Sequence, residues 1–321
     1  MIARLGILTA AIALAFSAPA AQAQPYPSKP IKVVVPLTPG SPVDVMARLV
    51  SQHLSPSLGQ PVIVENRPGA GGTIGAKSVA IAEPDGYTIL LTAANHVIAP
   101  SAYKNLTYDP VKDFVAVGAV ATSPFVIVVT PSLPVKTVPE LVAYAKANPG
   151  KVNWGFGLGT SPHLLGELFK HTTQTDIAAI PYKGGANAVT DMLAGQIQMN
   201  IGTTATLVPL VHSGRLKAIA VTGDARYPDL PDVPTMIESG FPQLSLGFWC
   251  GILAPVGVSA DVVGKLNAAL NRILVTQEMK ASLAKLGAQP SPGSPKDFAA
   301  LLAKELKDWG EAVRLTNVKL N

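Results

Sequence analysis

The sequence predicts a two-lobed α/β protein, and three observations support this fold class. Short runs of β-branched residues alternate with stretches of helical periodicity, which is typical of α/β architecture. The 321 residues are enough for two domains of ~150 residues each. The composition is 48% hydrophobic and only 14% charged, which excludes a disordered chain and favours well-developed cores.

Residues 1–23 have the pattern of a secretory signal peptide. Arg4 precedes an apolar run over residues 5–16, and the small residues of Ala21-Gln-Ala23 follow as a cleavage site, so Gln24 is the expected first mature residue. The apolar run is too short to span a bilayer comfortably, and an uncleaved anchor is the alternative interpretation. We expect a soluble mature protein, which in a diderm bacterium would be located in the periplasm.

The expected strands are short apolar runs rich in β-branched residues, at 31–35, 62–65, 87–91, 114–121, 125–129, 198–201 and 217–222. The expected helices have apolar residues at helical spacing, at 44–54, 139–147, 162–171, 186–194, 207–212, 260–276 and 295–314. Runs without polar alternation, such as 33–35 and 126–129, suit parallel strands that helices cover on both faces.

The order of these elements predicts a discontinuous first domain. No strand separates the C-terminal helices, so we expect them to pack back on the first lobe. The predicted division is residues 24–124 and 246–321 for domain 1, and residues 125–245 for domain 2.

Four loops of small polar residues stand at predicted strand–helix junctions. The first begins at Thr38, where Ser41 fits a helix N-cap, Pro42 the first helical position and Asp44 the acidic partner of a capping box. The other three loops span residues 157–163, in which Ser161-Pro162 repeats the cap-then-proline arrangement, 182–187 and 202–206.

Each of these junctions would present backbone N–H groups and hydroxyls at the positive end of a helix dipole, which favours an anion. One junction alone is an ordinary capped helix, but four at the carboxyl ends of strands indicate a ligand crevice. None of the loops contains arginine, so backbone N–H groups, hydroxyls and water would hold a carboxylate. The loops therefore predict reversible binding of a small organic anion.

Other motifs argue against a cofactor, a metal or a nucleic-acid partner. The glycine-rich stretch at 69–75 has one residue too many for a dinucleotide fingerprint and does not directly follow a strand. The five histidines form no metal pattern, and the net charge of +5 is spread along the chain. Cys250 is the single cysteine, which excludes an intramolecular disulfide, and its apolar neighbours indicate an inert core thiol.

Several side chains near the predicted crevice are candidate ligand contacts. Asn95 and His96 follow the strand at 87–91, where His96 either points into the crevice or has a surface or capping role. His163 shares a helix face with Glu167, which favours a helical pair or a binding contact over two metal ligands. Four aromatic residues either belong to the core or stack on a flat ligand: Trp154, Phe156, Phe248 and Trp249.

Six motifs, in the same order, identify a resemblance to a known family. They are Tyr26-Pro-Ser-Lys-Pro-Ile31, Val64-Glu-Asn-Arg-Pro-Gly-Ala-Gly-Gly72, Pro84-Asp-Gly-Tyr87, Tyr108-Asp-Pro-Val-Lys-Asp-Phe114, Pro181-Tyr-Lys-Gly-Gly185 and Leu230-Pro-Asp-Val-Pro-Thr235. Through them the chain resembles, over nearly all of its mature length, the solute-binding proteins of the tripartite tricarboxylate transporter family, also called Bug receptors.

The resemblance implies a periplasmic binding protein fold of type II-like architecture, with two lobes and a hinge that closes on a small organic carboxylate. It implies a monomer without enzymatic activity, cofactor, metal or nucleic-acid partner. The receptor would deliver a mono- or dicarboxylate to the membrane subunits of the transporter. The aromatic residues near 154–156 indicate a ligand larger than succinate, with an aromatic dicarboxylate as one candidate. A sensor for a membrane signalling partner and a secreted hydrolase are the alternatives.

Members of the family hold the ligand carboxylate at the first strand–helix loop and at loops of the second lobe, largely through main-chain N–H groups and ordered waters. Carried over to this sequence, these positions are Thr38, Gly40, Ser41, Gly159, Thr160, Ser161, Gly184, Gly185 and Thr203. The first loop departs from the usual Ala-Pro-Gly-Gly pattern, because Ser41 replaces the second glycine and Pro42 removes one potential N–H donor. With Asn95, His96 and His163, these residues form the predicted ligand site.

Overall fold

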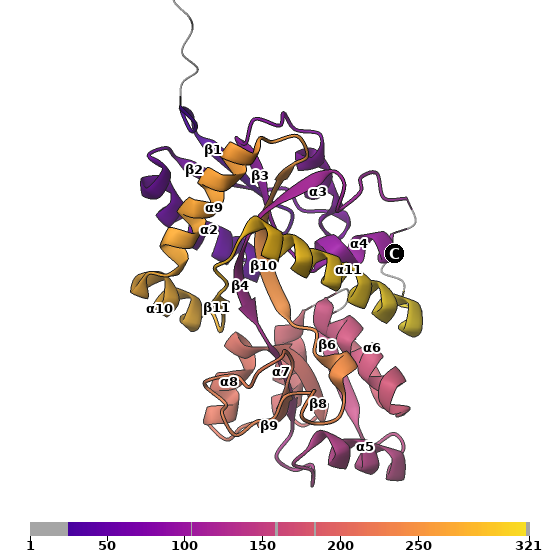
Figure 1. The fold of residues 1–321 in the computed structure, drawn as a ribbon. Coiled ribbons are helices and arrows are strands. Elements are labelled where there is room, and N and C mark those ends of the chain that lie inside the picture. The colour runs from indigo at the N-terminus through magenta and orange to yellow at the C-terminus, as the bar shows by residue number, and fades with distance from the viewer. Residues whose placement is uncertain (1–24, 104, 158–159, 183, 319–321) are drawn as a thin grey trace, which may run out of the picture.

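The structure, a computed structural model, describes residues 25–318 except for residue 104, residues 158–159 and residue 183. The predicted signal peptide and Gly159 therefore lie outside the described residues. Two β-sheets with helices packed against them form two lobes (Figure 1). The predicted two-lobed α/β class is confirmed.

The first lobe contains a six-stranded sheet in the order β11-β4-β10-β3-β1-β2. Its strands are β1 (Ile31–Val35), β2 (Val62–Asn66), β3 (Thr88–Ala93), β4 (Phe114–Ser123), β10 (Phe248–Pro255) and β11 (Gln289–Pro290). Its helices are α2 (Pro42–Leu58), the short 3₁₀ helix η1 (Ala70–Gly72), α3 (Thr73–Ala80), α4 (Asn95–Ala102), α9 (Ala260–Leu274) and α10 (Gln277–Lys285). β1 pairs in parallel with β2 and β3, whereas β10 runs antiparallel to β3 and β4.

The second lobe contains a five-stranded sheet in the order β7-β6-β8-β5-β9. Its strands are β5 (Phe125–Val129), β6 (Asn153–Gly157), β7 (Ala178–Tyr182), β8 (Met199–Thr203) and β9 (Lys217–Val221). Its helices are α5 (Val138–Ala147), α6 (Ser161–Thr173), α7 (Gly185–Leu193), α8 (Thr204–His212) and the short 3₁₀ helix η2 (Pro242–Leu244).

The chain passes between the two sheets at two neighbouring points. β4 ends at Ser123 and β5 begins at Phe125, so the first crossing takes a single residue. The second crossing enters β10 at Phe248, which is the antiparallel partner of Ser123. The two connections between the lobes therefore lie side by side.

All seven predicted strands and all seven predicted helices are present, with ends that shift by up to four residues. The elements that were not predicted from the sequence include β6, β7, β10, β11, α3, α4 and α10. β6 contains two glycines, and β7 is an exposed edge strand that contains Pro181. Glycine and proline weaken the residue pattern by which strands are recognised.

The predicted direction of β5 is wrong. All five residues of β5 are buried, as the lack of polar alternation indicates, but the strand runs antiparallel to both β8 and β9. An apolar run indicates that both faces of a strand are buried, and both parallel and antiparallel strands can be buried in this way. For β1, which pairs in parallel with both neighbours, the same reasoning is correct.

The last helix, α11 (Pro295–Thr316), packs on the first lobe, as expected for the C-terminal helices, and also contacts the second lobe. α9 and α10 do pack within the first lobe, but α11 packs on β4 and α4 and also on α6 (Figure 1). Glu305 of α11 is buried, and its Oε2 accepts hydrogen bonds from Nε1 of Trp249 at 2.9 Å and of Trp309 at 2.6 Å. The bond from Trp249 holds α11 to β10 close to the second crossing, and the bond from Trp309 lies within α11.

None of the helices in the described part of the chain combines the length and apolar character that a membrane span requires.

Candidate functional site

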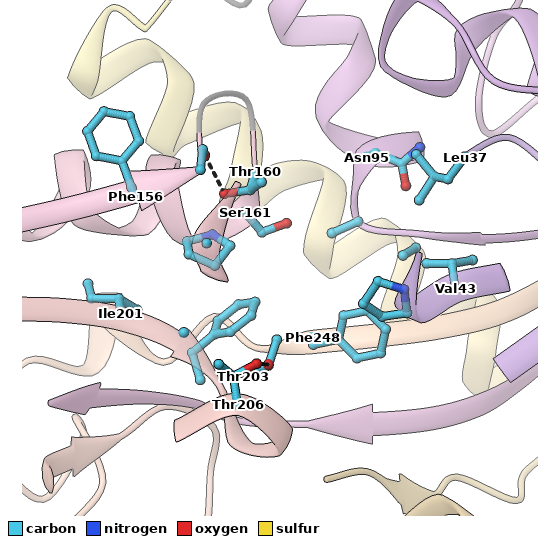
Figure 2. A pocket seen from close by; sticks show the side chains of 18 of the residues that line it. Leu37, Val43, Asn95, Phe156, Thr160, Ser161, Ile201, Thr203, Thr206 and Phe248 are labelled. Carbon is cyan, nitrogen blue, oxygen red and sulfur yellow. Dashed lines mark hydrogen bonds between the residues drawn. The ribbon is translucent and has the colours of Figure 1, made fainter. Parts of the chain in front are cut away.

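A cavity of about 740 Å³ lies between the two lobes, and this size suits a small-molecule ligand. The first lobe contributes the β1–α2 loop, η1, the β3–α4 junction and Tyr103. The second lobe contributes the start of β5, the end of β6, β8 and the N-terminal turns of α6, α7 and α8. Phe248, at the second crossing, lies between the two walls (Figure 2).

The N-terminus of α6 presents two hydroxyl side chains at the cavity. Thr160 is the N-cap, one residue earlier than predicted, and its Oγ1 accepts from the His163 amide at 3.4 Å and donates to the Gly157 carbonyl at 2.8 Å. Ser161 is the first helical residue, and its hydroxyl points into the cavity (Figure 2). A side-chain cap therefore fixes the start of α6 and leaves Ser161 facing the cavity.

The N-termini of α7 and α8 face the same cavity, and no side chain caps either helix. Gly184 precedes α7, and Gly185 and Ala186 of its first turn line the cavity. Thr203 precedes α8, and its Oγ1 lies 3.1 Å from Oγ1 of Thr206, one turn into the helix. Because helix N-termini carry partial positive charge, three such ends around one cavity favour an anion there.

The first strand–helix loop has the predicted capping residues, but of these only Pro42 lines the cavity. Ser41 caps α2 by accepting from the Asp44 amide at 3.3 Å, and Pro42 is the first helical residue. The predicted capping box is altered, because the Asp44 carboxylate accepts from the Gly40 amide at 2.9 Å and not from Ser41. Thr38 and Gly40 are exposed to solvent and lie outside the cavity lining.

Asp44 is 2% exposed and occupies the amide that a ligand carboxylate was expected to use. Arg48 donates to its Oδ2 at 3.1 Å and Asn66 donates to its Oδ1 at 2.8 Å. Burial raises the pKa of Asp44, but the hydrogen bonds from Arg48, Gly40 and Asn66 outweigh burial and lower it below the ordinary value. The first loop therefore holds its own ionised carboxylate.

The residues that the first loop does place on the cavity are apolar. Leu37, Pro42 and Val43 line the cavity from this loop and the start of α2 (Figure 2). Their wall continues into Ile98 and Ala99 of α4. In the sequence, the apolar residues of such a wall cannot be distinguished from residues of the hydrophobic core.

His96 does not point into the cavity, contrary to one expectation from the sequence. It is 1% exposed, and its ring packs against the rings of Tyr108 and Phe114, with centroids 5.9 and 4.9 Å away. Its Nε2 lies 2.9 Å from the carbonyl oxygen of Pro110, and burial lowers the pKa of its imidazole to about 4. His96 is therefore a neutral core residue of the first lobe.

Asn95, the residue before His96, does line the cavity. Its Nδ2 donates to the Gly71 carbonyl at 3.1 Å, whereas its Oδ1 is buried without a hydrogen-bond donor among the described residues. A buried acceptor of this kind is normally satisfied by water or a ligand.

His163 supports the cavity wall from behind. Its ring is stacked on the ring of Phe156 with centroids 4.2 Å apart and planes 2° from parallel, and burial lowers its pKa. Phe156 and Phe248 line the cavity, whereas Trp154 and Trp249 are buried in the core. Two of the four aromatic candidates thus face the ligand space.

The structure brings five of the predicted site residues onto the cavity: Asn95, Thr160, Ser161, Gly185 and Thr203. Gly184 borders it as the N-cap of α7, and the predicted residues outside the lining are Thr38, Gly40, Ser41, His96 and His163. Residues of the lining that the sequence analysis missed include Leu37, Val43, Ile98, Tyr103, Phe125, Val189, Ile201 and Thr206.

The lining has no charged side chain among the residues that the structure describes. Its polar side chains are neutral: Asn95, Tyr103, Thr160, Ser161, Asn200, Thr203 and Thr206. Within the same described residues, no group of three or more His, Cys, Asp or Glu side chains has an arrangement that would hold a metal ion. Backbone amides, hydroxyls and side-chain amides are thus the polar groups available to a ligand.

Comparison with known proteins connects this fold and cavity to a family. Residues 46–318 match the family described as "Tripartite tricarboxylate transporter family receptor". The chain is 37% identical over 319 residues to the protein BugT of Bordetella pertussis, with 98% of each chain covered.

Two similar solved structures contain dicarboxylates. Rpa4515 of R. palustris, solved with adipate, is 33% identical with a TM-score of 0.77, covering 92% of this chain and 99% of that chain. MatC (Rpa3494) of Rhodopseudomonas palustris, solved with bound malate, is 32% identical with a TM-score of 0.74, covering 90% of this chain and 100% of that chain. On this match in both sequence and fold, the chain belongs to the tripartite tricarboxylate transporter receptor family, a family of solute-binding receptors.

Proposed function

We propose that this protein captures a small organic carboxylate in the periplasm and delivers it to the membrane subunits of a tripartite tricarboxylate transporter. The observation that carries the proposal is the cavity of about 740 Å³ into which the N-terminal turns of α6, α7 and α8 open. The carboxylates in Rpa4515 and MatC support the same ligand chemistry. The protein acts without catalysis or a cofactor.

The two neighbouring crossings provide a hinge for capture. We take residues 24–124 and 246–321 as one domain and residues 125–245 as the other, because the chain changes sheets between Ser123 and Phe125 and again before Phe248. A ligand that contacts both walls of the cavity lowers the free energy of the closed arrangement relative to the open one. Since the described lining holds a carboxylate without a full opposite charge, release to a transporter requires no ion pair to be broken. The protein acts as a monomer.

Titration calorimetry on residues 24–321 tests the proposal. The protein is unfolded and refolded first, because a ligand that co-purifies would mask binding by mass action. Hexanoate, adipate, malate and benzoate are each compared with the corresponding primary amide. We expect at least one carboxylate to bind with a Kd on the order of 1 μM, or about −8 kcal/mol, and its neutral amide to bind far more weakly. Equal affinity for acid and amide, or no binding of any carboxylate, would contradict the proposal.

A further inference from the structure

Building on the proposed function, we infer that the preferred ligand is a monocarboxylate with an apolar body. The ligand lies with its carboxylate at the second lobe and its apolar body against the first. The cavity would therefore select monocarboxylates over dicarboxylates such as the adipate in Rpa4515 and the malate in MatC.

The second-lobe wall concentrates the groups that recognise an anion. The first turns of α6, α7 and α8 all reach the cavity, and Ser161, Thr203 and Thr206 add hydroxyls to their amides (Figure 2). Hydroxyls and backbone N–H groups donate hydrogen bonds to a carboxylate, and the helix dipoles add partial positive charge from the same side. One carboxylate is therefore well satisfied at this wall.

The first-lobe wall offers fewer donors, because a side chain caps α2 and the uncapped N-terminus of α4, at Ala94 and Asn95, is the one free helix start that reaches the cavity from the described part of this lobe. Leu37, Val43 and Ile98 present apolar side chains, and the nearby amide of Gly40 already donates to the carboxylate of Asp44. Asp44 stays ionised and is paired with Arg48, so this guanidinium is already engaged by a carboxylate of the protein. A second carboxylate on the ligand would lose its hydration here without gaining a charged partner.

The polar side chains of the first-lobe wall do not change this balance. Asn95 donates one of its two Nδ2 protons to the Gly71 carbonyl and leaves the buried acceptor Oδ1 unsatisfied, and this oxygen suits a ligand hydroxyl or N–H group and not a carboxylate. Tyr103 contributes one neutral phenol. Phe156 and Phe248 add aromatic surface between the two walls, and such surface favours an apolar and even a flat ligand body.

Matched acid pairs test the inference by titration calorimetry on the refolded protein. Hexanoate and adipate have the same number of carbons, and 4-methylbenzoate and terephthalate share a ring and a shape, so each pair differs by one carboxylate. We expect the monoacid of a pair to bind roughly tenfold tighter or better, since the diacid buries an unpaired charge. A diacid that binds as tightly as its monoacid, or tighter, overturns the inference and leaves carboxylate capture intact. Absence of binding by all four acids and by malate contradicts both.

A pair of Leu37 variants tests the orientation independently. Leu37→Lys places an ammonium group on the first-lobe wall, and Leu37→Met is the uncharged control of similar length. We expect the affinity ratio of adipate to hexanoate to rise roughly tenfold in the lysine variant relative to the methionine variant, because the second carboxylate gains a charged partner. The melting temperature of each variant verifies folding. An unchanged ratio in folded protein would show that the far end of the ligand does not face this wall.

Discussion

Thr204 and Gly287 join the two lobes through a buried hydrogen bond. Oγ1 of Thr204, the first residue of α8, donates to the carbonyl oxygen of Gly287 at 2.5 Å, across 83 positions of the chain. Ser123, at the end of β4, donates to the same carbonyl at 2.6 Å. The start of α8, which lines the cavity through Thr206, is thus bonded to the first lobe beside the crossing from β4 to β5.

Gly287→Ala is expected to weaken both folding and ligand binding. Gly287 has a φ of +67°, and an added Cβ would collide with the Thr204 hydroxyl and the Ala205 amide. We expect the free energy of unfolding to fall by about 1–3 kcal/mol in urea titrations, and the displaced start of α8 to lower ligand affinity. Gly264→Ala is the control, because this helical glycine has open space around it and should gain about 0.5–1 kcal/mol. Wild-type stability in Gly287→Ala would show that the contact between the lobes is not close.

Thr160→Val is expected to reduce ligand affinity and to destabilise the protein slightly. The substitution removes the cap of α6, which costs about 1 kcal/mol, at a residue that lines the cavity, and it also removes the hydrogen bond to the Gly157 carbonyl. Thr160→Ser retains the hydroxyl and should retain both properties. Titration calorimetry and thermal melts compare the two variants. If the valine and serine variants bind the ligand equally well, the Thr160 hydroxyl does not contribute to binding.

Cys250 is expected to resist thiol reagents in the native protein. The side chain is fully buried beside Met46, with 3.2 Å between the two sulfur atoms, and burial raises the pKa of its thiol to about 12. The thiolate is the reactive form, so both access and ionisation oppose modification. Ellman's reagent should react with one thiol per chain only after guanidinium is added. Rapid reaction of the native protein would contradict the buried position.

His96 is expected to make folding less favourable in mild acid. Its folded-state pKa of about 4 lies below the unfolded value of 6.5, so between these values the unfolded chain binds a proton that the folded protein does not. Above pH 6.5 this group does not reduce the free energy of unfolding. As the pH falls toward 4, protonation of His96 in the unfolded chain lowers the free energy of unfolding by up to about 3 kcal/mol.

His96→Gln isolates this contribution, because the glutamine amide can still donate to the Pro110 carbonyl but does not titrate. Urea titrations at intervals between pH 4 and pH 7 should show a smaller loss of stability in acid for the variant than for the wild type. Identical pH profiles would mean that the imidazole is accessible to protons in the folded state.

The local features of this protein follow from neighbouring residues in the chain, and they could be predicted. Apolar runs and helical periodicity identify β1, β5 and α9, because the covered faces of an element repeat with its backbone geometry. Ser41 and Pro42 mark the start of α2, since a cap needs only residues within one helical turn. The same local chemistry predicted the strand–helix junctions at residues 157–163, 182–187 and 202–206, and residues of all three junctions line the cavity.

Contacts between residues that are distant in the sequence decide which of these local features lie together in the structure. The Asp44 carboxylate takes the Gly40 amide within a network that includes Asn66, 22 positions away, and this removes the first loop from the predicted anion site. The direction of β5 depends on pairing with β8 and β9, and the exclusion of His96 from the cavity depends on Tyr108 and Phe114 packing around it. Local patterns encode burial and capping, but pairing direction and the supply of free donors are set only when separate segments pack together.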